Sequence, residues 1–215
     1  MAGQKKKNQA HPPLPGVCGI DEAGRGPLAG PVMAAAVVLP PDLDAPGLAD
    51  SKTLAPRRRE RLRELLIAGG AWIGRGLAWP EEIDRLNIHQ ATLLAMGRAW
   101  EDLVAVLEGV PRAESPEVAE ILVDGLYLPP ERALLRGTPV SARAVTGGDG
   151  LHREIMAASI IAKTERDAWM RNYHARDPRY GFDRHKGYPT RDHKEALLRH
   201  GPCPIHRRTF RGVQT

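Results

Sequence analysis

Two adjacent carboxylates, Asp21 and Glu22, end an apolar run and open a stretch that carries several glycines and one arginine. The apolar residues 17–20 are typical of the end of a buried strand. Glycines just past a strand let the backbone approach a ligand closely, because no Cβ stands in the way. An arginine beside them can contact phosphate. Since carboxylates are oxygen ligands for Mg²⁺ or Mn²⁺, this stretch predicts a metal site that works on phosphate.

The geometry of this pair sets a condition. Neighbouring residues on a regular strand point to opposite faces, so Asp21 and Glu22 share one metal centre only if the strand ends or bulges there. The alternative is that both are solvated carboxylates at a strand end. Two nucleotide-binding motifs are incomplete: Ala29 replaces the last glycine of a G-x-G-x-x-G, and Ala162 replaces the glycine of a P-loop before Lys163.

Two further aspartates occupy comparable positions. Asp124 directly follows a predicted apolar strand at 119–123, which repeats the arrangement at Asp21, and ligands of α/β sheets bind at strand ends. Asp149 precedes a helix predicted from about 151 to 174, whose first half is apolar nearly all round and is therefore buried. Two interpretations of Asp149 stay open. It either caps this helix or serves, because it is held in place, as a third metal ligand.

The bulk composition narrows the class of partner and the compartment. The chain has 215 residues and a formal net charge of +5, which favours a polyanionic partner through counterion release. An acidic pit in a basic surface is what a metal-dependent nuclease needs. No apolar stretch approaches the roughly 20 residues that cross a bilayer, and residues 1–11 lack an apolar signal core. Cys18 and Cys203 form no disulfide framework, so we expect a cytoplasmic protein without membrane contact.

Hydrophobic periodicity predicts one α/β domain with a mixed sheet, preceded by a disordered basic arm at 1–15 and followed by an appended helical lobe. The predicted strands are 16–21, 30–39, 71–79, 119–123 and 142–145, with an antiparallel hairpin between the first two. The predicted helices are 56–68, 80–86, 87–107, 151–174 and 191–200. Residues 126–142 are predicted to be loop.

Candidate substrate contacts lie outside the acids. Basic and aromatic residues alternate over 180–190, which suits stacking on a sugar or base plus phosphate contact; a charged surface loop is the alternative. Lys52 either touches substrate phosphate or is a surface lysine. His200, Cys203 and His206 resemble part of a zinc site, which we disfavour because structural zinc takes four ligands.

Several motifs in a fixed order resemble one known family. They are GIDEAGRGPLAGPV, DSK, NIHQATLLAM, VDG, GGD followed by AASIIAK-x-x-RD, HKGYPT and HR-x-TF, spread over about residues 16–210. Together they resemble type 2 ribonuclease H, or ribonuclease HII. The resemblance implies a ribonuclease H-like fold, with a mixed sheet flanked by helices over 16–175. It also implies a C-terminal helical extension over 176–215 that contacts substrate.

The resemblance implies an activity and a set of residues. The family hydrolyses the RNA strand of RNA–DNA hybrids and cuts on the 5′ side of single ribonucleotides embedded in duplex DNA, as ribonucleotide excision repair requires. Two divalent ions, Mn²⁺ or Mg²⁺, are expected on four catalytic, metal-binding acids. These acids are Asp21, Glu22, Asp124 and Asp149. The implied substrate contacts are Gly24, Arg25 and Gly26 at the ribose 2′-hydroxyl, Tyr188 at the next sugar, and Lys52, Lys163 and Arg207 near the phosphates.

The chain departs from the family pattern at one place. Gly147 stands where the family carries a lysine, and the segment between Asp124 and Asp149 is longer than expected.

A DNA nuclease or resolvase of the same fold and a non-catalytic basic binding module are the competing functions. We expect the protein to act as a monomer.

Overall fold

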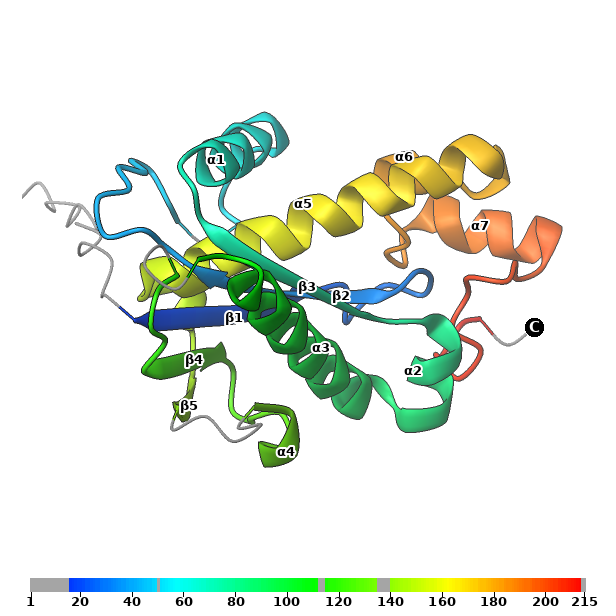
Figure 1. Ribbon diagram of the computed structural model, residues 1–215. Coiled ribbons are helices and arrows are strands. Elements are labelled where there is room, and N and C mark those ends of the chain that lie inside the picture. Colours follow the sequence, from blue (N-terminus) through cyan, green and yellow to red (C-terminus); the bar gives the residue numbers. More distant parts are fainter. Residues whose placement is uncertain (1–15, 50, 112–114, 135–139, 214–215) are drawn as a thin grey trace, which may run out of the picture.

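A mixed five-stranded sheet flanked by helices forms the centre of the molecule (Figure 1). The computed structural model describes residues 16–49, 51–111, 115–134 and 140–213. The strands are β1 (Val17–Ala23), β2 (Val32–Val38), β3 (Trp72–Ala78), β4 (Glu120–Asp124) and β5 (Ser141–Val145). They are ordered β3-β2-β1-β4-β5, with β1, β2 and β3 antiparallel and β4 and β5 parallel to β1. The predicted α/β class and mixed pairing are confirmed.

The helices match most of the predicted segments. They are α1 (Pro56–Ala68), α2 (Pro80–Leu86), α3 (Ile88–Glu108), α4 (Glu131–Leu134), α5 (Arg153–Arg176), α6 (Phe182–His185) and α7 (Arg191–His200), with 3₁₀ turns η1 (Gly148–Gly150) and η2 (Pro178–Tyr180). Residues 126–142 are not all loop, because α4 forms within them. The arm predicted at 1–15 lies outside the described residues. None of the described helices is both long and apolar enough to span a membrane.

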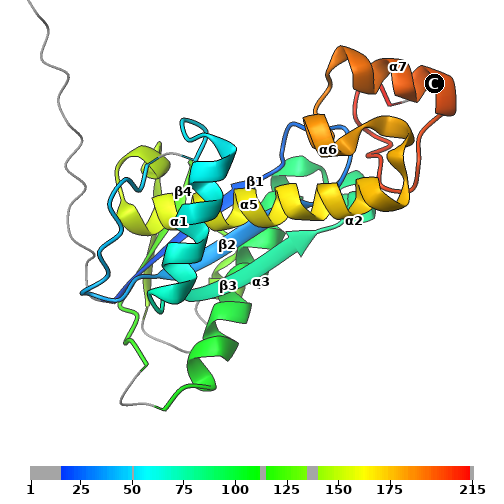
Figure 2. The ribbon, with the colours of Figure 1, turned by 90° about the horizontal axis from the view of Figure 1, so that it is seen from above.

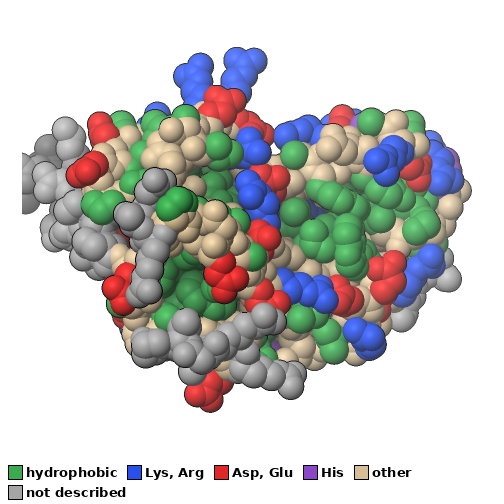
Figure 3. Space-filling model, viewed as in Figure 1, with side chains coloured by type: hydrophobic (Ala, Val, Ile, Leu, Met, Phe, Trp, Pro, Cys, Tyr) green, Lys and Arg blue, Asp and Glu red, His purple; other side chains and the backbone are tan. Residues whose placement is uncertain are grey.

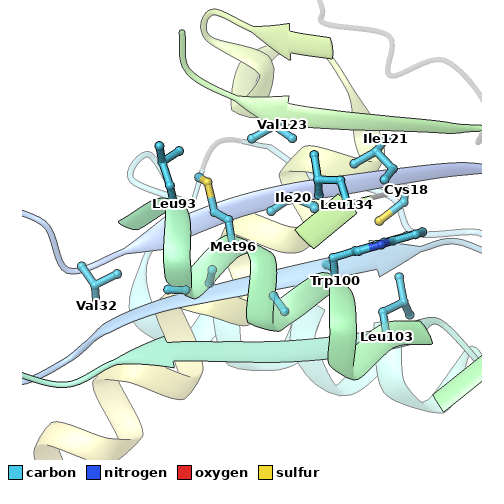
Figure 4. Close-up of a cluster of buried hydrophobic side chains, with 14 of the residues drawn as sticks. Cys18, Ile20, Val32, Leu93, Met96, Trp100, Leu103, Ile121, Val123 and Leu134 are labelled. Carbon is cyan, nitrogen blue, oxygen red and sulfur yellow. The ribbon is translucent and has the colours of Figure 1, made fainter. Parts of the chain in front are cut away.

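One face of the sheet is covered by α3, which Figure 4 shows in close-up. Alternate residues of the strands, Cys18 and Ile20 on β1 and Ile121 and Val123 on β4, point to this face. Helix α3 packs against them with an apolar stripe at helical spacing. The labelled residues of that stripe are Leu93, Met96, Trp100 and Leu103. This burial fixes the register of β1 and β4, and so the positions of the acids at their ends.

The opposite face is covered by α1 and α5. Strand β2, between β3 and β1, is buried along its whole length and contains three successive alanines, Ala34, Ala35 and Ala36. Such short side chains let helices pack closely on both faces. The approach of α5 to β1 is closer still: a Cβ on Gly19 would lie 2.2 Å from the backbone carbon of Glu154. The buried first half of α5 is therefore held directly against the strand that carries Asp21.

A separate apolar cluster forms beyond the end of the sheet, where Figure 2 shows α6 and α7 beside the last turns of α5. It joins Leu28 from the β1–β2 connection to Met170 of α5 and to Phe182, Leu197 and Ile205 of the C-terminal segment. Helix α7 begins at Thr190, whose hydroxyl accepts from the backbone N–H of His193. The C-terminal segment is thus packed on the connection that follows the first two acids.

The close packing of β3 on α3 gives a stability prediction. A Cβ on Gly76 would lie 2.1 Å from the carbonyl oxygen of Ala95 and 2.3 Å from the nitrogen of Ala99, both backbone atoms. We expect Gly76→Ala to lower the free energy of unfolding by about 1–3 kcal/mol, because α3 must shift away from the sheet. Chemical denaturation measures the change.

Gly109→Ala is the matched control for this measurement. Gly109 has φ −78° at the end of α3, and a Cβ there meets its nearest neighbours at 3.5 Å, an ordinary contact. It should change stability little. Equal stabilities of the Gly76 and Gly109 variants would contradict the close packing.

Candidate functional site

Three aspartates that are distant in the chain converge at one edge of the sheet. Asp21 lies near the end of β1, Asp124 ends β4, and Asp149 lies in η1. One carboxylate oxygen of each falls within 4.8 Å of the others. Because β1 and β4 are parallel neighbours, their carboxyl ends meet at the same edge. The η1 turn is tied to them, since the N–H of Gly148 donates to Oδ1 of Asp124 at 2.7 Å.

Burial and mutual repulsion make it unfavourable for all three carboxylates of this cluster to be ionised at once. Asp21 is 3% exposed, and burial, followed by repulsion from Glu22 and Asp124, raises its pKa well above the ordinary value. Burial, followed by the charge of Asp149, raises the pKa of Asp124. A bound divalent cation would remove this repulsion. Clustered, partly desolvated carboxylate oxygens are the donor set of Mg²⁺ and Mn²⁺, so the residues present fit such an ion.

Glu22 lies beside the cluster, outside the group of three. The expectation that β1 ends or bulges at this point is wrong: β1 pairs with β2 residue by residue through Ala23, with Asp21 opposite Ala35 and Glu22 opposite Ala34. Regular pairing directs their Cβ atoms to opposite faces of the strand, yet the two carboxyl groups still interact, and the charge of Glu22 helps to raise the pKa of Asp21. Glu22 still interacts electrostatically with Asp124, and Nη1 of Arg25 lies 3.5 Å from its Oε1.

Asp149 does not cap the following helix. Helix α5 begins after His152, whose side chain makes no capping hydrogen bond, and Asp149 lies one turn earlier. Its Oδ2 instead accepts from Nζ of Lys52 at 2.8 Å. Lys52 is therefore a neighbour of the acid cluster, although most of its side chain is exposed. Gly147, where the family carries a lysine, has φ +67°, and a Cβ there would meet nothing within 4 Å.

The glycine-rich turn after β1 is shaped by two buried arginines. Gly24 has φ +100°, and a Cβ there would lie 2.1 Å from Nε of Arg166, so only glycine fits. Arg166 of α5 donates to the carbonyls of Ala29 and Pro31, each at 3.0 Å. Arg207 donates to the carbonyls of Gly24 at 2.6 Å and of Arg25 at 2.9 Å, and to that of Gly30.

The position of Arg207 excludes one expected role. Its side chain is fully buried and donates to three backbone carbonyls, and its guanidinium lies 5.0 Å from the ring of Phe210. The family resemblance implied that Arg207 contacts a substrate phosphate. Its buried position excludes that contact. Arg207 shapes the turn from behind, because it holds the carbonyl oxygens of Gly24 and Arg25.

Tyr188 and Lys163 lie on the open side of this turn. A Cβ built on Gly26 would lie 3.7 Å from a ring carbon of Tyr188, which is 40% exposed. Nζ of Lys163 is 5.8 Å from the centre of that ring and donates to Oδ1 of Asp167 at 2.7 Å. Gly26, Tyr188 and Lys163 therefore lie next to one another on this side of the turn.

Some residues of the site were not predicted from the sequence. Ser159 of α5 hydrogen-bonds the carboxylate of Asp21 and lies 2.7 Å from the hydroxyl of Ser51. A serine within the apolar first half of α5 is the signal that could have indicated it. Arg166 gave a similar signal, as a charged residue that helical spacing places on the buried side of α5.

The disfavoured zinc site is absent. His200 is exposed on α7, whereas Cys203 and His206 are buried. Nδ1 of His206 lies 3.0 Å from Sγ of Cys203, and its Nε2 lies 3.0 Å from Nε2 of His193. The two ring nitrogens thus face different partners and share no ligand position.

The surface charge is mixed on the face that Figure 3 shows. Lysine and arginine side chains lie there among aspartates and glutamates, and no single basic stripe crosses this view. Basic groups next to the acid cluster, such as Lys52 and Arg25, matter more to the site than the total charge.

A carboxylate cluster at the strand ends of a mixed sheet, beside a backbone turn and basic side chains, is the arrangement that a metal-dependent nuclease requires. Comparisons with known proteins agree. Residues 18–213 match the family model described as Ribonuclease HII. The chain is 50% identical to a ribonuclease HII of Maricaulis maris over 92% of this chain and 83% of that protein. It is also 50% identical to a ribonuclease HII of Halorhodospira halophila, over 93% of each chain.

A solved structure supports the same assignment. Ribonuclease H2 from Pyrococcus horikoshii superposes with a TM-score of 0.63 at 28% identity, covering 92% of this chain and 94% of that one. The chain therefore belongs to the ribonuclease HII family, a family of metal-dependent nucleases with the ribonuclease H fold.

The repulsion among the acids gives a prediction for Asp21→Asn in metal-free protein. The pKa of Asp21 is higher in the folded than in the unfolded chain, so this group lowers stability as the pH rises above its unfolded value near 4. Asn carries no charge. At pH 7 the variant should unfold with a free energy higher by about 1 kcal/mol or more. Denaturation in the presence of a chelator measures this.

Added Mg²⁺ provides the second half of the measurement. It should raise the melting temperature of the original protein more than that of Asp21→Asn, because the variant offers the ion one charge fewer. Asp42→Asn, at an exposed position between β2 and α1, is the matched control. It should match the original protein both in metal-free stability and in its response to Mg²⁺. A metal-free Asp21→Asn protein that is less stable than the original would contradict the assigned repulsion.

Proposed function

We propose that this protein is an endoribonuclease that hydrolyses the RNA strand of RNA–DNA hybrids and cuts 5′ of single ribonucleotides embedded in duplex DNA. The observation that carries the proposal is the convergence of Asp21, Asp124 and Asp149 within 4.8 Å, next to the turn at Gly24–Gly26. The first feature suits a cation on a phosphate, and the second suits a backbone contact to a sugar. The products would be 5′-phosphate and 3′-hydroxyl ends.

The acids would hold two divalent ions, Mg²⁺ or Mn²⁺. Asp21, Asp124 and Asp149 are the principal ligands, and Glu22 is the fourth. Such ions, when bound, polarise the scissile phosphate, activate water and stabilise the leaving 3′-oxygen. Ser159 orients the carboxylate of Asp21 through its hydroxyl. Lys52, 2.8 Å from Asp149, holds that carboxylate and adds a positive charge for the phosphate.

Selectivity for RNA would come from the ribose 2′-hydroxyl, the group that distinguishes ribose from deoxyribose. The backbone of Gly24, Arg25 and Gly26 can reach this hydroxyl on the open side of the turn, because the exposed Gly26 has no side chain in the way. The carbonyls of Gly24 and Arg25 already accept from Arg207, which fixes the orientation of both peptide groups. Arg207 is therefore a positioning residue, not a phosphate ligand.

The C-terminal segment from residue 176 would hold the nucleic acid next to this turn. Tyr188 packs on the neighbouring sugar, and Lys163, beside its ring, contacts a phosphate. The lysine is itself anchored by Asp167 at 2.7 Å. Residues 16–175 would then form the catalytic domain, with 176–215 as its substrate-binding extension. We infer that the enzyme acts as a monomer in the cytoplasm, in the removal of ribonucleotides from DNA.

A cleavage assay tests the function. The substrate is a DNA duplex with one embedded ribonucleotide, compared with an all-DNA duplex and with an RNA–DNA hybrid, each with and without Mg²⁺ or Mn²⁺. We expect metal-dependent cleavage 5′ of the ribonucleotide and none of the all-DNA duplex. Cleavage of the all-DNA duplex would indicate a DNA nuclease, and binding without any cleavage would indicate a binding module.

Asp21→Asn should abolish this cleavage and leave substrate binding largely intact. The substitution removes one charge from the cluster but keeps the volume of the side chain, so the contacts around Gly26 and Tyr188 remain. Rates and binding constants are measured on the duplex with one ribonucleotide. Turnover equal to that of the original protein would refute the metal-binding role of Asp21.

Tyr188→Ala should lower kcat/KM on the duplex with one ribonucleotide by about tenfold, the order of one lost stacking contact. Tyr127→Ala is the matched control, since Tyr127 is likewise an exposed tyrosine but contacts His89 on α3 and not the turn at Gly26. An effect of Tyr188→Ala no larger than that of the control would remove Tyr188 from the site.

A further inference from the structure

A chain of buried imidazoles ends on the backbone of Tyr188. His193 of α7 and His206 of the C-terminal segment are 0% and 1% exposed. Nε2 of one lies 3.0 Å from Nε2 of the other, and Nδ1 of His193 lies 2.9 Å from the carbonyl oxygen of Tyr188. None of these contacts is used by the acids or by the turn at Gly24–Gly26.

The direction of every hydrogen bond in this chain follows from one donor. The backbone N–H of Cys203 donates to Nδ1 of His206 at 2.9 Å, so that nitrogen carries no proton. Neutral His206 must then be protonated on Nε2, and it donates to Nε2 of His193. His193 in turn must be protonated on Nδ1, and it donates to the carbonyl of Tyr188.

The surroundings keep both rings neutral and fix their planes. Burial lowers the pKa of His193 and of His206 to about 4. His193 also stacks on His185, with ring centres 4.6 Å apart. His185 accepts from the N–H of Gly187 at Nδ1, and its Nε2 lies 2.7 Å from the carbonyl of Tyr180. The turn that leads into Tyr188 is therefore held from both sides.

The same C-terminal residues also hold the glycine-rich turn. Ala29 pairs with His206 as an antiparallel β-bridge, and the N–H of Arg207 donates to the carbonyl of Leu28 at 2.9 Å. The side chain of Arg207, next to His206, donates to Gly24 and Arg25. Residues 203–207, here called the C-terminal brace, thus hold the turn at Gly24–Gly26 through Arg207 and are linked to Tyr188 through His206 and then His193.

We propose that His193 and His206 are positioning residues that orient Tyr188 relative to the turn at Gly24–Gly26, through a directed hydrogen-bond chain that starts at Cys203. This inference rests on the proposed role of Tyr188 at the sugar next to the ribonucleotide. Both rings are buried and belong to no part of the acid cluster. Their substitution should therefore change sugar recognition and leave metal binding unchanged.

His193→Phe tests the chain. It keeps an aromatic ring beside His185 but removes both polar partners. We expect kcat/KM on the duplex with one ribonucleotide to fall about fivefold, the order of one lost buried hydrogen bond. The Mg²⁺ concentration that gives half-maximal rate should not change. His200→Phe, the same substitution at an exposed histidine of α7, is the control and should leave both values unchanged.

The double variant His193→Phe with Tyr188→Ala separates the two proposals. If His193 acts through Tyr188, its substitution costs nothing further once the tyrosine ring is gone. A full additional fivefold loss in the double variant overturns the positioning role while the role of Tyr188 stands. If Tyr188→Ala alone has no effect, the proposed contact of Tyr188 fails, and this inference fails with it.

A spectroscopic measurement on the unaltered protein covers the case in which His193→Phe does not fold. Nitrogen-15 NMR of the imidazoles should show His206 protonated on Nε2 and His193 on Nδ1 at pH 7.

His193→Asn, whose amide can still donate to the Tyr188 carbonyl, should recover most of the activity that His193→Phe loses. His193 protonated on Nε2, or a His193→Asn enzyme as impaired as His193→Phe, would overturn the chain.

Discussion

The concentration of negative charge at the carboxyl end of β1 and β4 is the constraint on which the rest of the structure depends. Asp21 and Asp124 sit on parallel neighbouring strands, and η1 brings Asp149 to within 4.8 Å of both. Burial and mutual repulsion raise the pKa values of Asp21 and Asp124, so the fold holds these groups together against their own electrostatics. The hydrophobic faces of the sheet supply the free energy that allows this, since α3 and α5 fix the strands in register.

The two parts of the site are held by different means. Sheet register and the close approach of α5 at Gly19 position the acids. Hydrogen bonds from buried side chains position the turn at Gly24–Gly26, chiefly those of Arg166 and Arg207 to backbone carbonyls. Because Glu22 and Gly24 are only two residues apart, a small movement of the turn also moves the end of β1. The positions of the acids and of the turn are therefore coupled through the end of β1.

Local signals explain what could be predicted from the sequence. Helix α1 begins at Pro56 and α7 follows the capping residue Thr190, and both helices have their predicted bounds. Aspartates after apolar strands indicated Asp21 and Asp124, since strand ends share one edge of a sheet. Short elements were harder: α4 and α6 have four residues each, too few to show a period.

Other features depended on contacts between distant segments. The face to which Glu22 points follows from the unbroken pairing of β1 with β2 through Ala23, which no local pattern reveals. The motif around Arg207 predicted a phosphate ligand. In the folded chain Arg207 is buried and donates to the carbonyl of Gly30, which is 177 positions away in the sequence. Asp149 matched a helix cap by spacing alone, and η1 moves it one turn out of that role.

Because Arg166 and Arg207 donate to main-chain oxygens, the amino-acid sequence of this enzyme can vary at position 25, where one of those oxygens lies. Their donors contact carbonyls of residues 24, 25 and 29–31, and every amino acid has a carbonyl. The exposed side chain at position 25 can therefore be exchanged without disturbing the shape of the loop. Evolution, or a protein engineer, can therefore change the chemistry of the surface at that position while the scaffold beneath it keeps its form.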